Sequence, residues 1–311
     1  MSINFVTSKQ EHIKGVIFIG NNIVRTLADT ETGEIIEIHE GDTFKIVSTE
    51  QKQAIEKSIK NKQLNDDMKE WNKELGGFVF ILFKYGDKIF SQLPELIQED
   101  ITKLFYLAVF VDYEGVLVYN NEHMTRRTMQ RLIGISREKF SLFFNKLIKL
   151  NILSQNSNII KINKDIILKG EIEKSIKSNY NYTRLYINSI RYLYENVSIR
   201  KHKQLGAYFK LIPYIHRQQN TLCWNPDSYV NDINLMSVKE LKNILGYHED
   251  SIKRLTDKLK ETKLDNNESI LAFIDHDKDL SKAHIIINPR VFYGGNFDIL
   301  GEVSGILKWF K

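Results

Sequence analysis

An α+β fold that is mainly helical is predicted by a pattern that occurs twice in this chain. Residues 124–134 and 236–246 share their apolar positions and both end in glycine, at an offset of 112 residues. Each segment is followed by an amphipathic stretch and then by strand-like runs that close on a glycine, at 160–170 and at 285–294. The order helix, strand, helix, turn, helix, hairpin is typical of a winged helix-turn-helix. The sequence therefore predicts two winged helix-turn-helix domains.

The N-terminal part, residues 1–75, is expected to be a small β-rich module followed by a long helix. Runs of β-branched and apolar residues flank Gly20 and Gly33, which is typical of β-hairpins. A polar helix is expected over residues 49–75, and the glycine pair that follows predicts where it ends. Because residues 1–75 carry a net charge of −3, we expect this module to offer a surface for a partner or for oligomerisation.

The first winged helix is expected at residues 76–170. Its central feature is Gly134, because the sharp turn between the two helices of the motif often requires a positive φ angle. Ser136 has a residue type that is favoured at the N-terminal cap of the next helix. The apolar face of that helix is expected to pack into the core through Phe140, Phe143, Phe144 and Leu147.

Three further parts are expected: a helical connector at 171–204, a second winged helix at 205–295 and a C-terminal tail at 296–311. The connector is interpreted as a helix over residues 183–197, and its many tyrosines as packing residues rather than a stacking platform for single-stranded bases. In the second copy, Ser237 and Glu240 have the spacing of a capping box. The core face of its second helix is expected to be Ile252, Leu255 and Leu259.

The net charge of the chain is only +5, from 44 basic and 39 acidic residues, but it is unevenly distributed. Residues 124–164 hold nine basic residues and one acid, whereas residues 205–311 hold fourteen of each. A basic segment of this kind is typical of a nucleic-acid-binding surface, because each Lys or Arg that neutralises a phosphate releases a counterion. The sequence thus predicts that the first winged helix binds double-stranded DNA.

The candidate DNA contacts of the first winged helix follow from its docking mode, in which the second helix enters the major groove. Arg and Asn side chains pair with guanine and adenine, while Lys and Ser contact bases or phosphates. The candidates on the second helix are Arg137, Lys139, Ser141, Asn145, Lys146 and Lys149. The candidates for phosphate contacts are Arg126, Arg127 and Arg131 on the preceding helix, with Lys161 and Lys164 near the wing.

The second winged helix is expected to be the weaker DNA reader. The exposed side of its second helix includes Glu249, Asp250 and Asp257, and carboxylates near phosphates lower affinity. Its candidate DNA contacts are Lys253, Arg254 and Lys258. This copy is expected to supply a second contact to DNA, a dimer surface or a protein contact.

The composition excludes several other classes of protein. A single cysteine, Cys223, excludes a disulfide framework and zinc clusters built on paired cysteines. No apolar run approaches the ~18 residues that span a bilayer, and the first residues lack the order of a signal peptide. No phosphate-binding loop and no His-x-x-x-His pair occurs. We therefore expect a cytoplasmic protein with no enzymatic activity, metal or cofactor.

The first copy carries three short motifs around its turn and wing. They are Ile-Gly-Ile-Ser at 133–136, Asn-Ile-Leu-Ser at 151–154 and Ile-Ile-Leu-Lys-Gly at 166–170. Together with Glu-Thr-Gly-Glu-Ile-Ile-Glu-Ile at 31–38, this stretch resembles the RepL-type replication proteins of plasmids and phages of Gram-positive bacteria. The resemblance covers about residues 25–171 and implies DNA binding in replication initiation. The tandem arrangement is similar in plan to plasmid and phage initiators with two winged helices.

These observations predict a sequence-specific double-stranded DNA-binding protein of a plasmid or phage, which initiates replication by binding origin repeats through its first winged helix. The first alternative is a transcriptional repressor with the same DNA-reading parts. The second is a winged-helix module that binds other proteins. The expected partners are double-stranded DNA, a second copy of the chain as a homodimer, and host replication or transcription proteins. No membrane partner is expected.

Overall fold

The structure, a computed structural model, describes residues 25–28, 35–38, 49–84, 96–173, 180–274, 283–294 and 305–310. The chain divides into two compact units, residues 1–59 and residues 60–311. In the first unit, β1 (Arg25–Ala28) pairs antiparallel with β2 (Ile35–Ile38), which confirms the hairpin predicted around Gly33. The hairpin predicted around Gly20 lies outside the described residues.

Helix α1 (Thr49–Glu74) begins and ends where the sequence predicts. Gly76 and Gly77 follow it with φ angles of 71° and 80°, a left-handed conformation that glycine adopts without steric cost. The last turns are anchored by Trp71, whose ring meets the ring of Tyr186 edge-on with their centroids 6.4 Å apart. Among the described residues, no helix combines the length and the apolar character needed to cross a membrane.

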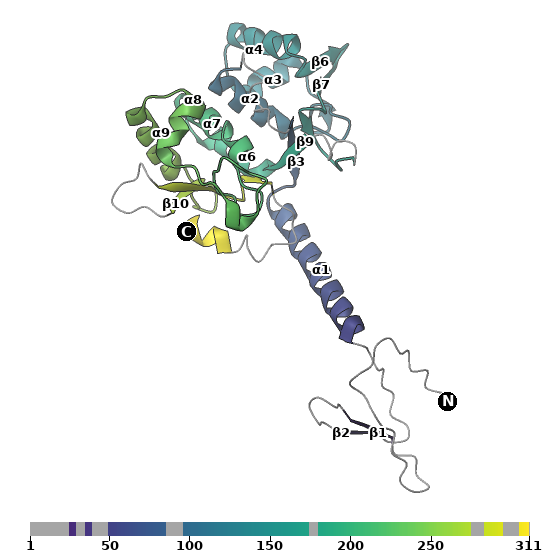
Figure 1. The fold of residues 1–311 in the computed structure, drawn as a ribbon. Coiled ribbons are helices and arrows are strands. Elements are labelled where there is room, and N and C mark those ends of the chain that lie inside the picture. The colour runs from purple at the N-terminus through teal and green to yellow at the C-terminus, as the bar shows by residue number, and fades with distance from the viewer. Residues whose placement is uncertain are drawn as a thin grey trace. The chain divides into compact units, whose positions relative to one another are not determined.

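The first repeat runs from β3 (Phe78–Lys84) to β8 (Ile167–Leu168), and Figure 1 shows its β6–β7 hairpin beside α3 and α4. Its other elements are α2 (Gln98–Ala108), β4 (Val118–Tyr119), β5 (Glu122–His123), α3 (Arg126–Ile133), α4 (Arg137–Lys149), β6 (Leu153–Asn156) and β7 (Ile159–Ile162). Helix α3 ends at the residue before Gly134 and α4 begins at the residue after Ser136, as the turn glycine and the cap predict.

The second repeat runs from β9 (Tyr180–Tyr186) to β12 (Phe292–Tyr293). Its helices are α6 (Ile187–Asn196), α7 (His202–Phe209), α8 (Leu241–Leu245) and α9 (Glu249–Glu261), and its hairpin is β10 (Leu271–Ile274) with β11 (His284–Ile287). Short 3-10 helices are η1 (Ile199–Lys201), η2 (Ile212–Tyr214), η3 (Val230–Asp232), η4 (Val238–Glu240) and, near the C-terminus, η7 (Lys308–Phe310). The bounds of α9 are those of α4 plus 112 residues, and the bounds of β11 are those of β7 plus 125. The predicted internal repeat is therefore confirmed.

The segment predicted as the start of a connector helix is a strand instead. Residues 183–186 belong to β9, and helix α6 begins only at Ile187. The reason is that β3 is a continuous, buried apolar strand whose backbone N–H and C=O groups need partners on both sides. The tyrosines, Thr183 and Leu185 of β9 are residue types that suit a pleated, half-buried surface.

One antiparallel sheet joins the two repeats, with its four strands in the order β12–β9–β3–β8. The first strands of the repeats, β3 and β9, pair in its centre from Phe78 with Tyr186 to Lys84 with Tyr180. Each of them also pairs with the last strand of its own repeat, β3 with β8 and β9 with β12. Each repeat therefore contributes one inner and one outer strand.

The register of this sheet has approximate two-fold symmetry. Ile81 pairs with the first residue of β8, and Leu185 pairs with the first residue of β12, so these two positions are equivalent at an offset of 104 residues. At the same offset, Phe80 is equivalent to Arg184, and these two residues pair with each other. The symmetry axis therefore passes between Phe80 and Arg184.

Helices α2 and α7 are equivalent at that same offset, and they cross each other in close contact. On one side of the crossing, the Thr102 hydroxyl donates a hydrogen bond to the backbone oxygen of His202, with 2.7 Å between the two oxygens. On the other side, Gly206 lies against the backbone of Gln98, and a Cβ added to Gly206 would stand 1.8 Å from the Gln98 backbone oxygen. The absence of a side chain at position 206 is what permits this approach.

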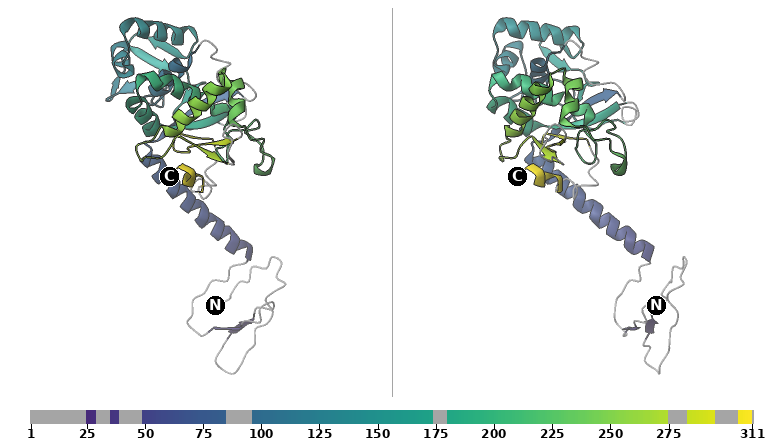
Figure 2. Two further views of the ribbon diagram at one scale, coloured as in Figure 1. Left: turned by 90° about the vertical axis from the view of Figure 1, so that its left-hand side faces the viewer. Right: turned by 60° about the vertical axis from the view of Figure 1, so that its left-hand side comes forward.

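The hydrophobic core is continuous from the first repeat into the second, and the two halves stay in contact in both views of Figure 2. Tyr106 of α2 stacks on Tyr194 of α6 with ring centroids 3.9 Å apart, and Phe105 of α2 packs on Phe209 of α7 at 5.0 Å. Such aromatic pairs contribute about 0.5–1.5 kcal/mol each beyond their buried area. Tyr186 and Tyr194 are both buried, which confirms the interpretation as packing residues for these two tyrosines.

The imidazole of His202 is buried at the start of α7, against the end of α6. Its Nε2 lies 3.1 Å from the carbonyl oxygen of Tyr194 and 3.2 Å from that of Val197. Since both partners are acceptors, Nε2 must carry the hydrogen. Burial is the largest influence on the pKa of His202 and lowers it, although the two carbonyl oxygens act in the opposite direction.

We expect Gly206→Ala to destabilise the protein by about 2 kcal/mol or more, because its Cβ would overlap the backbone of α2. Helix propensity alone predicts the opposite sign, a stabilisation of about 1 kcal/mol. Urea unfolding measures the difference. Gly305→Ala is the matched control, since a Cβ at Gly305 has no atom within 4 Å. A Gly206→Ala protein as stable as the wild type would contradict the close crossing.

The unfolding free energy should fall as the pH is lowered below about 6.5, partly because of His202. Its pKa is lower in the folded state, so the unfolded chain takes up the proton first. The stability that neutral His202 contributes is therefore present above pH 6.5 and lost below it. Urea unfolding at pH 7 and pH 5 should show a smaller loss in His202→Gln than in the wild type. Equal losses in the two proteins would show that His202 does not titrate with folding.

Candidate nucleic-acid interface

The turn between α3 and α4 is fixed by local hydrogen bonds and one glycine. Thr125 caps α3 by accepting a hydrogen bond from the backbone N–H of Thr128, with 3.1 Å between nitrogen and oxygen. Gly134 ends α3 with a φ angle of 74°, as the sequence predicts. The hydroxyl of Ser136 then accepts from the N–H of Lys139 at 3.4 Å and caps α4. The relative direction of the two helices is thus set by residues at the turn itself.

A tyrosine of the second repeat supports this turn from behind. The hydroxyl of Tyr194 donates a hydrogen bond to the backbone oxygen of Ile133, with 2.8 Å between the two oxygens. The same ring is the one that stacks on Tyr106, so α3 is tied to both α2 and α6. Burial raises the pKa of the Tyr194 hydroxyl above its usual range, so it stays protonated as a donor.

Helix α4 has one apolar face and one polar face. The predicted core residues Phe140, Phe143, Phe144 and Leu147 are all buried. With 3.6 residues per turn, the side directly opposite them carries residues 138, 142, 145 and 149. We call these four, Glu138, Leu142, Asn145 and Lys149, the outer stripe of α4, and all four are exposed.

The basic residues of the first repeat lie largely on the surface. Of the nine between residues 124 and 164, eight are exposed and only Lys146 is partly buried. The exposed ones are Arg126, Arg127 and Arg131 on α3, Arg137, Lys139 and Lys149 on α4, Lys161 on β7 and Lys164 just beyond it. Ser141 of α4 is exposed as well. The structure thus brings predicted candidates from α3, α4 and the hairpin to the surface of one repeat.

Arg126 has a position that the sequence did not predict. Its guanidinium lies over the ring of Phe144, 4.0 Å from the ring centroid, and its Nη2 lies 3.4 Å from Oδ1 of Asn145. Stacking and hydrogen bonding together orient the Asn145 amide on the outer stripe. Arg126 is therefore a positioning residue for Asn145 as well as a surface cation.

Lys146 differs from the other candidates, because it is partly buried and has an acidic partner on another helix. Its ammonium lies 2.8 Å from Oδ2 of Asp100, a carboxylate on α2 that is only 4% exposed. Lys103 pairs with the other oxygen of Asp100 at 3.2 Å. The physical reason is that a buried carboxylate requires cationic partners, and Lys146 reaches Asp100 from α4. Lys146 thus fastens α4 to α2.

The two lysines at the β6–β7 hairpin, Lys161 and Lys164, differ from each other. Lys161 lies on β7 and is exposed, while its backbone pairs with Val116 in an isolated bridge. Lys164 lies 3.5 Å from a carboxylate oxygen of Glu114. Both groups of that ion pair are largely exposed, and such pairs contribute about 0–1 kcal/mol, so a phosphate can compete for Lys164.

The second repeat presents a different outer stripe. Residues equivalent at an offset of 112 are Asp250, Arg254, Asp257 and Glu261 on α9. Three carboxylates thus stand where α4 has one carboxylate, one amide and one ammonium. The predicted candidates Lys253, Arg254 and Lys258 are all exposed. Ile252, Leu255 and Leu259 form the core face, as predicted.

The predicted capping box of the second repeat is confirmed. The carboxylate of Glu240 accepts from the Ser237 backbone N–H at 2.8 Å and from its hydroxyl at 2.6 Å. These hydrogen bonds, with the one from the Ser237 hydroxyl first, lower the pKa of Glu240. Trp224 donates to the other oxygen of the same carboxylate at 3.0 Å, so the start of this helix is tied to the chain segment that follows the bridged residues 221–223.

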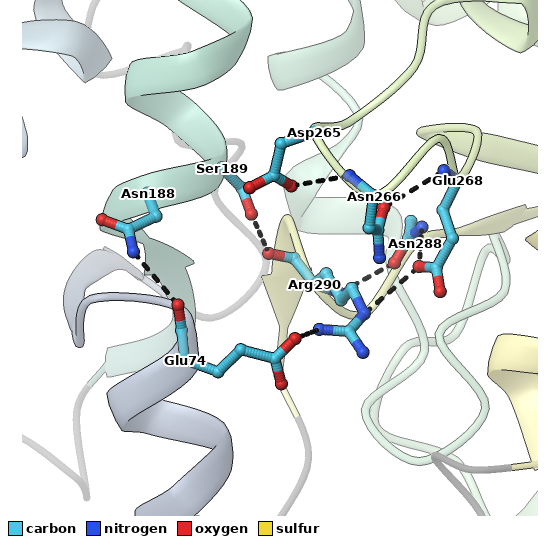
Figure 3. Close-up of polar contacts among 8 residues, drawn as sticks. All are labelled: Glu74, Asn188, Ser189, Asp265, Asn266, Glu268, Asn288 and Arg290. Carbon is cyan, nitrogen blue, oxygen red and sulfur yellow. Dashed lines mark hydrogen bonds and ion pairs between the residues drawn. The ribbon is translucent and has the colours of Figure 1, made fainter.

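A polar cavity of about 300 Å³ lies where α1, α6 and the end of the second repeat meet (Figure 3). Arg290 is its central charge, with Nη1 2.6 Å from Glu74 and Nε 3.2 Å from Glu268. The Arg290 guanidinium also lies 4.5 Å from the ring centroid of Trp71. Arg290 thus contacts Glu74 and Trp71 of α1 as well as Glu268. These contacts attach the end of α1 to the second repeat, so the lining of this cavity has a structural role.

Cys223 and His216, two side chains of reactive types, lie in the interior of the second repeat. Cys223 is buried, and burial raises the pKa of its thiol to about 11, which disfavours the reactive thiolate. His216 is buried, with its Nε2 2.9 Å from the backbone oxygen of Ser228. In the described part of the chain, no group of three or more His, Cys, Asp or Glu residues is placed to hold a metal ion.

Leu142 is the member of the outer stripe that the sequence analysis did not single out. It is 72% exposed at the centre of an otherwise polar face. The signal in the sequence is an apolar residue at helical spacing between Glu138 and Asn145, on the side opposite Phe140 and Phe144.

Comparisons of the chain with protein-family models, with curated proteins and with solved structures gave no match.

We expect Lys146→Ala to destabilise the protein by about 1–3 kcal/mol, because Asp100 would keep only one of its two cations. Lys139→Ala on the same helix is the control, and it should change the unfolding free energy by less than about 0.5 kcal/mol. Urea unfolding measures both. If Lys146 contacted DNA instead, its loss would lower DNA affinity and leave stability unchanged.

Proposed function

We propose that this protein is a sequence-specific double-stranded DNA-binding protein whose two repeats are winged helix-turn-helix domains. In the first repeat, α3, the Gly134 turn and α4 form the helix-turn-helix, and the β6–β7 hairpin forms the wing. In this motif the second helix enters the major groove, so α4 is the reading helix. The element order, the left-handed turn glycine and the capped start of α4 support the assignment.

The observation that carries the proposal is the distribution of charge on the first repeat. Eight of its nine basic residues between 124 and 164 are exposed, around an outer stripe that ends in an amide and an ammonium. Phosphate neutralisation supplies most of the affinity in protein–DNA complexes, and base contacts from the reading helix supply specificity. The acidic outer stripe of α9 makes the second repeat the weaker reader.

Replication initiation is the role favoured by the resemblance of residues 25–171 to RepL-type replication proteins. A plasmid or phage initiator binds repeated sites at an origin, so we expect an array of selected sites beside the gene or within it. A repressor with the same reading parts would instead have sites that overlap a promoter. Mapping the selected sequence onto the DNA that carries the gene distinguishes the two roles.

Binding of a random-sequence duplex library, followed by salt titration of the selected duplex, tests the proposal. Arg127→Ala should weaken binding to all sequences alike and reduce the salt slope by about one unit, because a phosphate contact is lost. Arg137→Ala should reduce discrimination at one base pair by about 1–3 kcal/mol. Fluorescence anisotropy measures both effects.

The matched control is Lys69→Ala, a surface lysine of α1 that pairs with Asp66 outside the repeats. It should leave the affinity and the salt slope unchanged. An affinity that does not change with salt concentration would contradict the assignment of α3 and α4 as the interface. So would an equal loss of affinity in Arg127→Ala, Arg137→Ala and Lys69→Ala.

A further inference from the structure

Leu142 is an isolated apolar side chain on a charged surface. Among the large apolar residues that the structure describes as exposed, only Tyr229 exceeds its exposed fraction of 72%, at 84%. A single exposed leucine is common on protein surfaces. This one, however, occupies the centre of the outer stripe, on the side of α4 that faces the major groove under the proposed function.

The neighbours of Leu142 argue against an apolar protein-docking patch. One turn before it is Glu138, and the next residues along the outer stripe are Asn145 and Lys149. Protein interfaces bury contiguous apolar area at their centre, whereas here one aliphatic side chain is surrounded by charged and amide groups. A small apolar target within a polar surface matches this pattern.

The major groove offers one such target, the C5-methyl group of thymine. Asn side chains pair with adenine, which is the partner base of thymine. Asn145 lies three residues from Leu142, and side chains at that spacing are about 5–6 Å apart on one face of a helix. The Asn145 amide is oriented by Arg126, which itself is held over Phe144. An apolar contact and an oriented amide therefore stand side by side.

We propose that Leu142 contacts a thymine C5-methyl group in the major groove, next to an adenine that Asn145 reads. This inference rests on the proposed function and specifies its target as a site with an A·T pair under the middle of α4. The second repeat lacks this pair of side chains, since Arg254 and Asp257 stand at the equivalent positions. The preference for the methyl group is thus a property of the first repeat alone.

The test uses the tightest duplex from the random-sequence selection, with each thymine replaced in turn by deoxyuridine, which lacks only the methyl group. The wild type should bind about fourfold more weakly at one position, the value expected for exposing one buried methyl-sized group. Leu142→Ala should bind the thymine and deoxyuridine duplexes equally. Lys69→Ala, on α1 outside the repeats, should retain the wild-type difference.

A second arm replaces adenines with 7-deazaadenine, which lacks the N7 acceptor. The sensitive adenine should lie within two base pairs of the sensitive thymine, and Asn145→Ala should abolish its effect while leaving the deoxyuridine effect in place. Because Leu142 is exposed, its truncation should not change the urea-unfolding midpoint. Loss of the methyl preference in Leu142→Ala is therefore not a folding defect.

The outcomes separate this inference from the proposed function. If binding is sequence-selective but no replacement of thymine by deoxyuridine lowers the affinity, the inference is wrong and the proposed function is unaffected. A thymine preference that persists in Leu142→Ala would also overturn it. The absence of salt-sensitive binding to any duplex in the selection would refute the function and the inference together.

Discussion

The pairing of β3 with β9 is the constraint on which the rest of residues 60–311 depends. Each repeat begins with one of these strands and ends with an outer strand of the sheet, which pairs with the first strand of its own repeat. Without the central pairing, each repeat would hold a two-stranded sheet with a long apolar edge exposed. The crossing of α2 and α7 follows the same approximate two-fold symmetry, so the sheet and the helix pair hold the two repeats in the same relative orientation. Helix α4 is fastened to this frame through Asp100, and the end of α3 through Tyr194.

Much of the fold could be predicted because its signals are local. The turn glycines, the caps and the apolar faces of α4 and α9 are set within a few residues of chain, and the repeat offset of 112 residues made them recognisable. Strand β9 was missed because its partner, β3, is about a hundred residues away. Residues 183–186 have a pattern compatible with either helix or strand, and only the need of β3 for a neighbour decides between them.

The candidate site was predicted in part for a similar reason. Helical periodicity gives the direction in which a side chain points relative to its own core face, and it placed Arg137, Asn145 and Lys149 on the surface. It does not say which charged residue another helix will require. Lys146 was assigned to DNA because Asp100, which lies 46 residues earlier, carries no local sign of being buried beneath α4. Arg126 likewise acquires its stacking role only when α3 packs on α4.

The close crossing of α2 and α7 has a consequence for how the two halves relate. A symmetric homodimer would have to place the same residue on both sides of such a crossing. Here one side has Thr102, which donates a hydrogen bond, and the other has Gly206, which makes room for the backbone of Gln98. Carrying both copies in one chain frees each side to evolve separately, and it makes their association independent of protein concentration. The outer stripes of α4 and α9 differ in charge, which shows that the two copies have also diverged on the surface.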